Sequence, residues 1–268
     1  SGVKIAQARV PSNLYPGDVS FVVKASGSAY KLYTIIYVYI EDYLYGVLPY
    51  EMGNGAHIEA LKAQAVSART YTLRAMTAAT SALYDVVDTT SDQVYNGTPS
   101  GYANCKAAVD ATKGIVSMNG SGFTGTWYTA SNGGQIESVK NLWGSSGYSY
   151  IRVKDDPYDL TNPESRVKSF TVNASGTQGN STFSSLLSAK AVTAFGSGAS
   201  VTGVTNVVAH TPRYAEPSRL YTKLDFYVNY AQGGAVKTGT LTFSVFDELE
   251  APLGMSISRA KNELWSVT

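Results

Sequence analysis

Apolar positions in the first part of the chain fall in short runs that are separated by turn residues. The runs KIAQARV, VSFVVKA and YKLYTIIYVYI are rich in β-branched and aromatic side chains. Pro16-Gly17-Asp18 and Ser26-Gly27-Ser28 lie between them. This arrangement is typical of strands joined by turns. Residues 3 to 40 are therefore predicted to form a β-sheet.

The pattern changes between Ile58 and Ala79, where Gly and Pro are absent and strong helix formers are frequent. A long helix is predicted there. At about 100° per residue, one arc of this helix is apolar and should face the core. Its members are Ile58, Leu61, Ala65, Ala68, Thr72 and Met76.

Two cations, Lys62 and Arg69, fall within the same apolar arc. A buried charge needs a partner, and the candidates are Glu51, the Glu41-Asp42 pair or a ligand. Alternatively, Lys62 extends past the apolar edge into water and Arg69 binds nearby carbonyl groups.

Further along, a shorter helix is predicted over 101–113 and ends at Gly114. Strands in IVSMNG and FTGTWYTAS then lead to the Gly-bearing turn SNGGQ. The Ser-, Thr- and Gly-rich stretch 170–200 marks a domain boundary and holds a short helix over 183–192. Beyond it, YTKLDFYVNY and KTGTLTFSVF predict two antiparallel strands.

These elements predict an α+β fold with mixed sheets and one long central helix. Residues 1–170 would form the main core, and residues 171–268 a smaller C-terminal mixed lobe. The formal net charge is +1, from 21 Lys and Arg against 20 Asp and Glu, which does not favour a nucleic-acid partner. Only 15% of residues are charged, and 20 are Tyr, a balance that fits a secreted or surface-exposed protein.

Cysteine and membrane signals exclude several alternatives. Cys105 is the single cysteine, so an intrachain disulfide and a Cys-based zinc site are impossible. The longest apolar run, LYTIIYVYI, is too short to span a bilayer. The sequence shows no signal peptide, and a trimmed signal or anchor would leave no trace.

Glu51 lies in VLPYEMGNGAHIEALKAQAVSARTY, after an aromatic and β-branched run and before the long helix. Alone, it is more often a solvated surface charge than a catalyst. A strand-end Glu in front of a helix that presents inward cations is a more specific pattern. It predicts a site around Glu51.

Six ordered blocks resemble the stage II sporulation protein D family, also called SpoIID/LytB. The resemblance is strong from Val38 to Asp159 and loose in the C-terminal third, and six blocks in order are more specific than any single motif. They are EDYLYGVLPYEM, EALKAQAVSARTYTL, DTTSDQVYNG, AVDATKGIV, YTASNGGQIES and LWGSSGYSYIRVKDDPYD.

Members of this family include lytic transglycosylases that cleave peptide-free peptidoglycan glycan strands during spore engulfment, and others modify cell-wall amidases. The resemblance implies cleavage between N-acetylmuramic acid and N-acetylglucosamine with a 1,6-anhydro product. Glu51, in the Pro-x-Glu-Met block, would be the catalytic acid. Lys62, Gln64 and Arg69 would line the site, although the helical angle of Gln64 points away from the two cations.

Other polar blocks suit sugar binding. The glycines of SNGGQIES would let backbone amides approach a ligand, although plain turns are an equally good interpretation. The predicted additional substrate-binding residues are Gln93, Tyr95, Tyr128, Ser131, Asn132, Gly133 and Gly134.

Two departures from the family pattern matter. Residues 53–57 read GNGAH where relatives carry Pro and Trp, and Thr129 to Asn132 stand where some relatives hold zinc. No metal or other cofactor is therefore expected. The expected partners are peptidoglycan glycan strands and a cell-wall amidase, in an extracytoplasmic location with membrane attachment only through an anchor outside this chain.

Two competing hypotheses differ in class from a glycan-cleaving enzyme. The same cleft could bind glycan or an amidase without catalysis, which the altered 53–57 segment favours and the presence of Glu51 opposes. A cysteine hydrolase using Cys105 with His57 or His210 is disfavoured, because Cys105 lies among Ala residues within a predicted helix.

Overall fold

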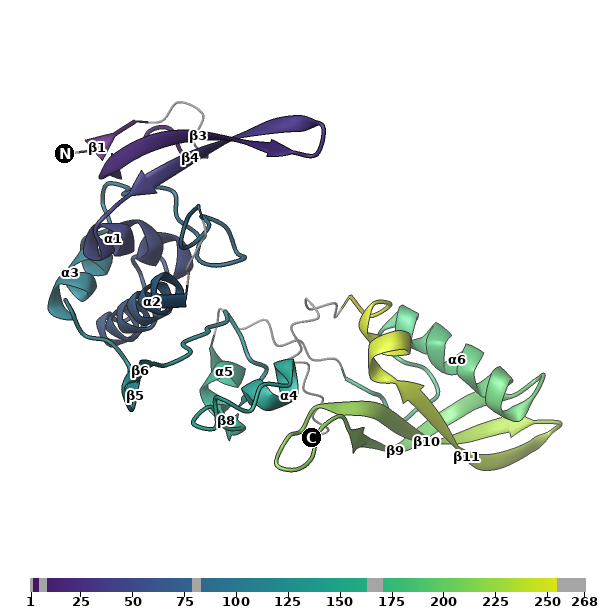
Figure 1. Cartoon of the computed structure of the whole chain (residues 1–268). Helices are drawn as coiled ribbons and strands as arrows, with labels where there is room; N and C mark the ends of the chain where they lie inside the picture. Colours follow the sequence, from purple (N-terminus) through teal and green to yellow (C-terminus); the bar gives the residue numbers. More distant parts are fainter. Residues whose placement is uncertain (1, 5–8, 79–82, 163–170, 255–268) are drawn as a thin grey trace. The chain divides into compact units, whose positions relative to one another are not determined.

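The computed structural model describes residues 2–4, 9–78, 83–162 and 171–254. The chain forms two compact units, Ser1–Tyr128 and Thr129–Thr268. Helices and small sheets occur in both units (Figure 1), which confirms the predicted α+β class. Each pair of described strands is antiparallel.

The first unit combines three helices with short sheets (Figure 1). A hairpin of β3 (Asp18–Ser26) and β4 (Ala29–Tyr37) precedes α1 (Ile40–Glu51), α2 (Ile58–Ala78) and α3 (Ala103–Ala111). The remaining strands are two residues each and pair as β1 (Gly2–Val3) with β2 (Tyr15–Pro16), and β5 (Met118–Asn119) with β6 (Gly122–Phe123).

The three helices bury one shared apolar core. Burial of these side chains is the main favourable contribution to packing the helices together. The core contains Leu44, Val47 and Leu48 of α1, Leu61, Ala65 and Ala68 of α2, and Cys105, Ala108 and Val109 of α3. The predicted apolar arc of α2 is correct over Leu61 to Thr72, whereas Met76 is exposed.

The prediction that Glu51 follows a strand is wrong. The chain leaves β4 at Tyr37 and begins α1 at Ile40, so Glu51 is the last residue of a helix. Acidic residues favour the first turn of a helix, and Glu41 and Asp42 occupy that turn. Apolar residues at helical spacing then bury one face of α1.

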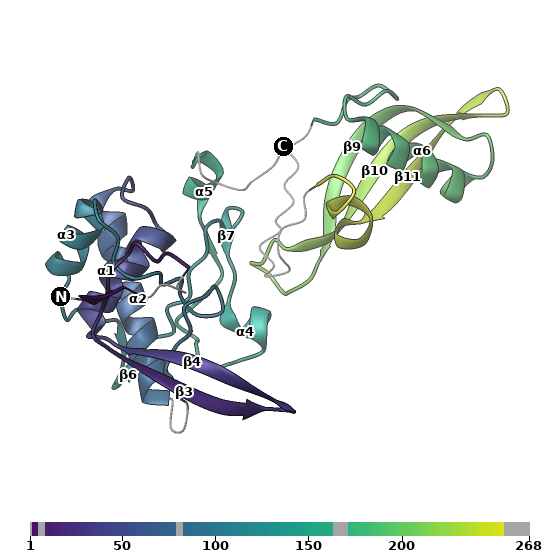
Figure 2. The ribbon, with the colours of Figure 1, turned by 90° about the horizontal axis from the view of Figure 1, so that it is seen from above.

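The second unit holds a three-stranded sheet under a helix. The strands β9 (Ser200–Pro212), β10 (Tyr221–Gln232) and β11 (Ala235–Ser244) lie in the order β11-β10-β9. Helix α6 (Ser181–Phe195) covers one face (Figure 2), where Phe183 packs against Phe226. A π-helix, Val245–Glu250, follows β11. The predicted C-terminal strands correspond to β10 and β11, and the predicted helix over 183–192 lies within α6.

Short elements occupy the first part of this unit. They are β7 (Gln135–Ile136), α4 (Val139–Trp143), β8 (Lys154–Asp155) and α5 (Pro157–Thr161). Buried polar contacts join this segment to the loop before β10. Gln135 Nε2 donates to the Pro217 carbonyl at 3.0 Å, and the Ser218 hydroxyl donates to Glu137 Oε2 at 2.6 Å.

These contacts group residues 129–162 with the C-terminal sheet. The division between the units thus lies earlier in the chain than the boundary expected at 170/171. The assignment of 1–170 as a catalytic core and 171–268 as a cleft-completing lobe stays a prediction.

Candidate functional site

Glu51 is held at the C-terminal end of α1 by a loop from elsewhere in the unit. Its side chain is partly buried, and its Oε1 accepts a hydrogen bond from the Val94 N–H at 2.7 Å. A helix C-terminus favours cations over carboxylates, so helix energetics do not explain an acid here. The Val94 amide fixes one carboxylate oxygen, and Oε2 has no hydrogen-bond partner among the described residues.

Tyr128 faces this carboxylate. Its hydroxyl is buried near the side chains of Glu51 and Gln93, and within the described part of the chain it forms no hydrogen bond of normal length. Burial, and then the negative charge of Glu51, raise the pKa of Tyr128 far above its ordinary value. Tyr128 therefore keeps its proton at neutral pH and offers a neutral hydroxyl beside Glu51.

Gln93 is a framework residue of this site and not an exposed loop residue. Its side chain is fully buried, and its Oε1 accepts hydrogen bonds from the hydroxyls of Tyr43 at 3.2 Å and Thr72 at 2.9 Å. Its Nε2 donates to the Ala68 carbonyl at 3.3 Å. Gln93 thus connects the loop that holds Glu51 to α2. Each polar atom of its side chain already forms a hydrogen bond within the unit, so neither is free for the predicted contact with substrate.

Tyr95 belongs to the core. It is 5% exposed, stacks on Tyr43 with ring centroids 5.0 Å apart, and meets Tyr15 edge-on at 6.0 Å. Its hydroxyl lacks a partner among the described side chains and backbone groups. These contacts assign Tyr95 to packing between α1 and the N-terminal strands.

Arg69 is a buried clamp. It is 1% exposed, and its Nε and Nη2 donate to the two carboxylate oxygens of Glu41 at 3.0 and 2.7 Å. Its other donors reach backbone carbonyls, with Ile115 at 3.0 Å the nearest. Both alternatives open from the sequence therefore hold in part, because Arg69 pairs with Glu41 and also binds carbonyl groups.

Lys62 lies on the exposed side of α2. Its Nζ pairs with Glu59 Oε1 at 2.7 Å, and one third of its side chain is exposed. The expectation that Lys62 points inward is not met, because the long side chain reaches an acid one turn earlier on the same helix surface. Neither Lys62 nor Arg69 pairs with Glu51.

Gln64 lies on the side of α2 that meets the loop carrying Val94, although its helical angle pointed away from Lys62 and Arg69. Gln64, Ala68 and Tyr71 form one stripe along α2, at spacings of four and three residues. Ala68 accepts from Gln93, and the Tyr71 hydroxyl donates to Asp92 at 2.7 Å, so this stripe meets the loop that carries Val94. Gln64 is 8% exposed, and its Nε2 has no partner in the described part of the structure.

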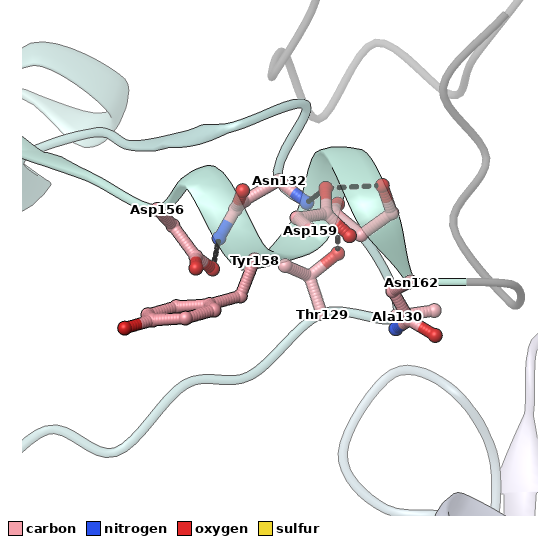
Figure 3. A pocket seen from close by; sticks show the side chains of 8 residues that line it. Thr129, Ala130, Asn132, Asp156, Tyr158, Asp159 and Asn162 are labelled. Atoms are coloured by element: carbon pink, nitrogen blue, oxygen red, sulfur yellow. Dashed lines mark hydrogen bonds between the residues drawn. The ribbon is translucent and has the colours of Figure 1, made fainter.

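The predicted SNGG turn lies in the second unit and surrounds a carboxylate (Figure 3). Asp159 Oδ2 accepts from the Ser131 hydroxyl at 2.7 Å, the Asn132 N–H at 3.0 Å and the Gly133 N–H at 2.8 Å. These donors were expected to approach a ligand. In the structure Asp159, a residue to which the sequence analysis gave no role, occupies them instead.

The rest of this turn is also internally bonded. Asn132 Nδ2 donates to Asp156 Oδ2 at 2.7 Å, and the Gly134 N–H donates to Asn132 Oδ1 at 2.9 Å. An open pocket of about 460 Å³ adjoins it. The lining residues are Thr129, Ala130, Ser131, Asn132, Asp156, Tyr158, Asp159 and Asn162.

Neither a metal-binding cluster nor a membrane-spanning helix occurs among the described residues. No group of three or more His, Cys, Asp or Glu side chains there is arranged to hold a metal ion. Across the described ranges, no helix is both long enough and apolar enough to cross a bilayer.

Part of the first unit is similar to a known protein family. The family model of the Stage II sporulation protein, SpoIID, matches residues 28–118. This segment is therefore similar to the SpoIID family over 91 of the 268 residues. It includes α1, α2 and α3 and therefore Glu51, Gln64 and Gln93, whereas Tyr128 and the SNGG turn follow it.

Two relatives are similar over part of the chain. An uncharacterized protein of Brachyspira hyodysenteriae is 41% identical over 106 residues, which cover 39% of this chain and 29% of the relative. A protein of Bacillus subtilis named amidase enhancer is 43% identical over 117 residues, which cover 43% of this chain and 15% of the relative. The matched segment thus spans less than a third of either relative.

Proposed function

We propose that the chain is a lytic transglycosylase of peptidoglycan, with Glu51 as its catalytic residue. It cleaves the glycan strand, preferably peptide-free, between N-acetylmuramic acid and N-acetylglucosamine. The observation that carries this proposal is the Glu51 carboxylate. One oxygen is fixed by the Val94 amide, the other is open, and the neutral Tyr128 hydroxyl stands beside it.

A single acid can perform both proton transfers. Protonated Glu51 gives its proton to the glycosidic oxygen as the bond from that oxygen to C1 of muramic acid breaks. The resulting carboxylate takes the proton of the C6 hydroxyl while that oxygen bonds to C1. The product is a 1,6-anhydro sugar, Glu51 regains its proton, and no water is consumed.

The surroundings of Glu51 support a dual acid and base. Gln93 and Tyr71 anchor the loop that holds Val94, so the carboxylate is positioned by buried contacts. Gln64 and Tyr128 add two buried polar groups with open hydrogen-bonding capacity in the described structure. Such groups suit sugar hydroxyls, which both donate and accept hydrogen bonds.

Replacing Glu51→Gln tests the proposal. We expect a loss of anhydro-sugar product of at least about 100-fold, because the proton carrier is removed. Products released from peptide-free glycan are measured by mass spectrometry. Glu59→Gln is the matched control, because Glu59 is an exposed acid paired with Lys62 on α2. If Glu51→Gln formed as much product as the wild type and kept its melting temperature, this mechanism would be ruled out.

One observation favours a second function. The Bacillus subtilis relative is named amidase enhancer, so this chain could instead bind glycan or an amidase in the cell wall without cleaving the strand. Wild-type protein that stimulates product release by a cell-wall amidase, yet yields no anhydro product alone, would establish that alternative. Both functions place the chain outside the cytoplasm at the cell wall, and a role in sporulation and engulfment belongs to the same proposal.

A further inference from the structure

A second pocket of the C-terminal unit is cationic. Its volume is about 520 Å³, which lies within the range of about 300–1,000 Å³ that suits small ligands. It is formed around α4 and the turn that follows it. Its polar lining includes Lys140, Ser145, Ser146, Tyr148, Ser149 and Arg152.

Among the residues that the structure describes, neither cation of this pocket has an acidic partner. No carboxylate occurs among the described residues that line it, and no Asp or Glu of the described chain forms an ion pair with Lys140 or Arg152. Asp155, close by in sequence, pairs instead with Arg219, and its Oδ1 accepts from Arg219 at 2.9 Å and from Gln135 Nε2 at 2.9 Å. Two positive charges are therefore left for a ligand.

The remaining lining suits a sugar. The hydroxyls of Ser145, Ser146 and Ser149 can each donate or accept. The ring of Tyr148 lies 6.1 Å from that of Tyr150, centroid to centroid, and supplies an aromatic surface. A lone inorganic anion would use the cations alone. The combination points to a saccharide that carries an acidic group.

We propose that this pocket, here called the Lys140–Arg152 pocket, binds the lactyl carboxylate of a peptide-free muramic acid residue. The identity of the glycan rests on the proposed function. In intact peptidoglycan the stem peptide is joined to this carboxyl group by an amide bond, which removes its charge. Only a stripped strand presents the carboxylate, so the pocket distinguishes stripped from intact strands through charge-assisted hydrogen bonds.

The contacts of α2 support this assignment. Arg69 and Lys62, the cations that the sequence offered for carboxylate recognition, pair with Glu41 and Glu59. If the protein recognises the lactyl carboxylate of a glycan strand, other cations must bind it. Of the groups described, Lys140 and Arg152 line a pocket of suitable size without an acid.

The test measures binding on the Glu51→Gln background, so that no strand is cut. The probes are peptide-free oligosaccharides of alternating N-acetylglucosamine and N-acetylmuramic acid, and the same oligosaccharides with the lactyl carboxyl group converted to a methyl amide. We expect the carboxylate form to bind about tenfold more tightly. Adding Lys140→Gln and Arg152→Gln together should abolish that preference, and each alone should reduce it.

The control is Lys237→Gln, which removes an exposed charge of the same unit whose Nζ donates to Gln232. It should preserve the preference, and all variants should keep the parent melting temperature. The proposal is overturned if the double variant retains the preference or if the parent shows none. Tighter binding of a glycerol phosphate oligomer than of the carboxylate oligosaccharide would also overturn it, because a phosphate polymer would then be the ligand.

The binding experiment and the Glu51→Gln assay test different claims, so one claim can be wrong while the other holds. Retained cleavage by Glu51→Gln would remove the mechanism but leave the measured charge preference intact. Loss of the preference with cleavage still dependent on Glu51 would remove only the Lys140–Arg152 pocket.

Discussion

Two pairs of basic residues in this chain have opposite surroundings. On α2 of the first unit, Arg69 and Lys62 each pair with a glutamate, whereas Lys140 and Arg152 of the second unit have no ion-pair partner among the described residues. The sequence drew attention to the first pair because it falls on an apolar helix face. The structure makes the second pair the better candidate for recognising an acidic ligand.

Desolvation explains the difference. A guanidinium that is 1% exposed can be kept only if the fold supplies its counterion, and Glu41 does so with both carboxylate oxygens. Such a residue has no donor left for substrate. Lys140 and Arg152 are exposed, so water satisfies them until a ligand arrives. A cation that the sequence pattern places on a buried helix face is therefore more often structural than ligand-binding.

Of the changes predicted here, Arg69→Met should lower the stability of the protein most. It leaves the Glu41 carboxylate without its guanidinium at a site where the Glu41 side chain is only 16% exposed. Removing one partner of a buried pair costs about 3–5 kcal/mol. We expect the melting temperature to fall by ~10 °C, measured by circular dichroism.

The variant Arg69→Met with Glu41→Leu is the control for that measurement. Removing both charges avoids the stranded carboxylate, so part of the lost stability should return. If Arg69→Met kept its melting temperature but bound peptide-free glycan more weakly, Arg69 would be a binding residue after all.

Alkaline pH should also lower the free energy of unfolding of the first unit, but by less than Arg69→Met does. Burial, followed by the hydrogen bond to Asp92, raises the pKa of Tyr71 to about 12. An unfolded tyrosine ionises near pH 10, so between about pH 10 and 12 the unfolded chain binds fewer protons than the folded one. Stability should therefore fall as pH rises through this window.

Urea unfolding at pH 9, 10 and 11 measures that dependence. Burial also raises the pKa values of Tyr43, Tyr95 and Tyr128, so the decline has several sources. Tyr71→Phe should make it shallower without removing it. An identical pH dependence in wild type and Tyr71→Phe would show that Tyr71 does not contribute.

The sequence predicted regular elements well where their pattern was uninterrupted. No Gly or Pro breaks α2, and β10 alternates buried with less buried residues from Leu224 to Tyr230, whereas β11 does so only from Thr240 to Ser244. Helix α1 was missed because an aromatic and β-branched run leads directly into it, and Gly46 and Pro49 lie inside it. Its apolar spacing is visible only once the start at Ile40 is known.

The site was predictable in part. The Pro-x-Glu-Met block marked Glu51, but the Val94 amide and the Tyr128 hydroxyl come from segments far along the chain, which periodicity does not bring together. The glycines of the SNGG turn led us to expect backbone amides that approach a ligand, and in the structure the Asn132 and Gly133 amides bind a carboxylate oxygen of the chain itself. That oxygen belongs to Asp159, and no local pattern reveals a contact across such a separation.

Lys62→Met should give the smallest effect and completes the comparison with Arg69→Met, since both replace a cation of α2 with the same residue. The Lys62 ammonium pairs with Glu59 at the helix surface, where solvent screens an exposed pair and its contribution to stability is small. Met preserves the apolar stem, so we expect the melting temperature to change by no more than about 2 °C. Binding of peptide-free glycan, measured on the Glu51→Gln background, should be unchanged, because the carboxylate is recognised by Lys140 and Arg152. A binding loss comparable to that of the Lys140→Gln, Arg152→Gln variant would return Lys62 to the site and show that an exposed ion pair on α2 opens to receive the ligand.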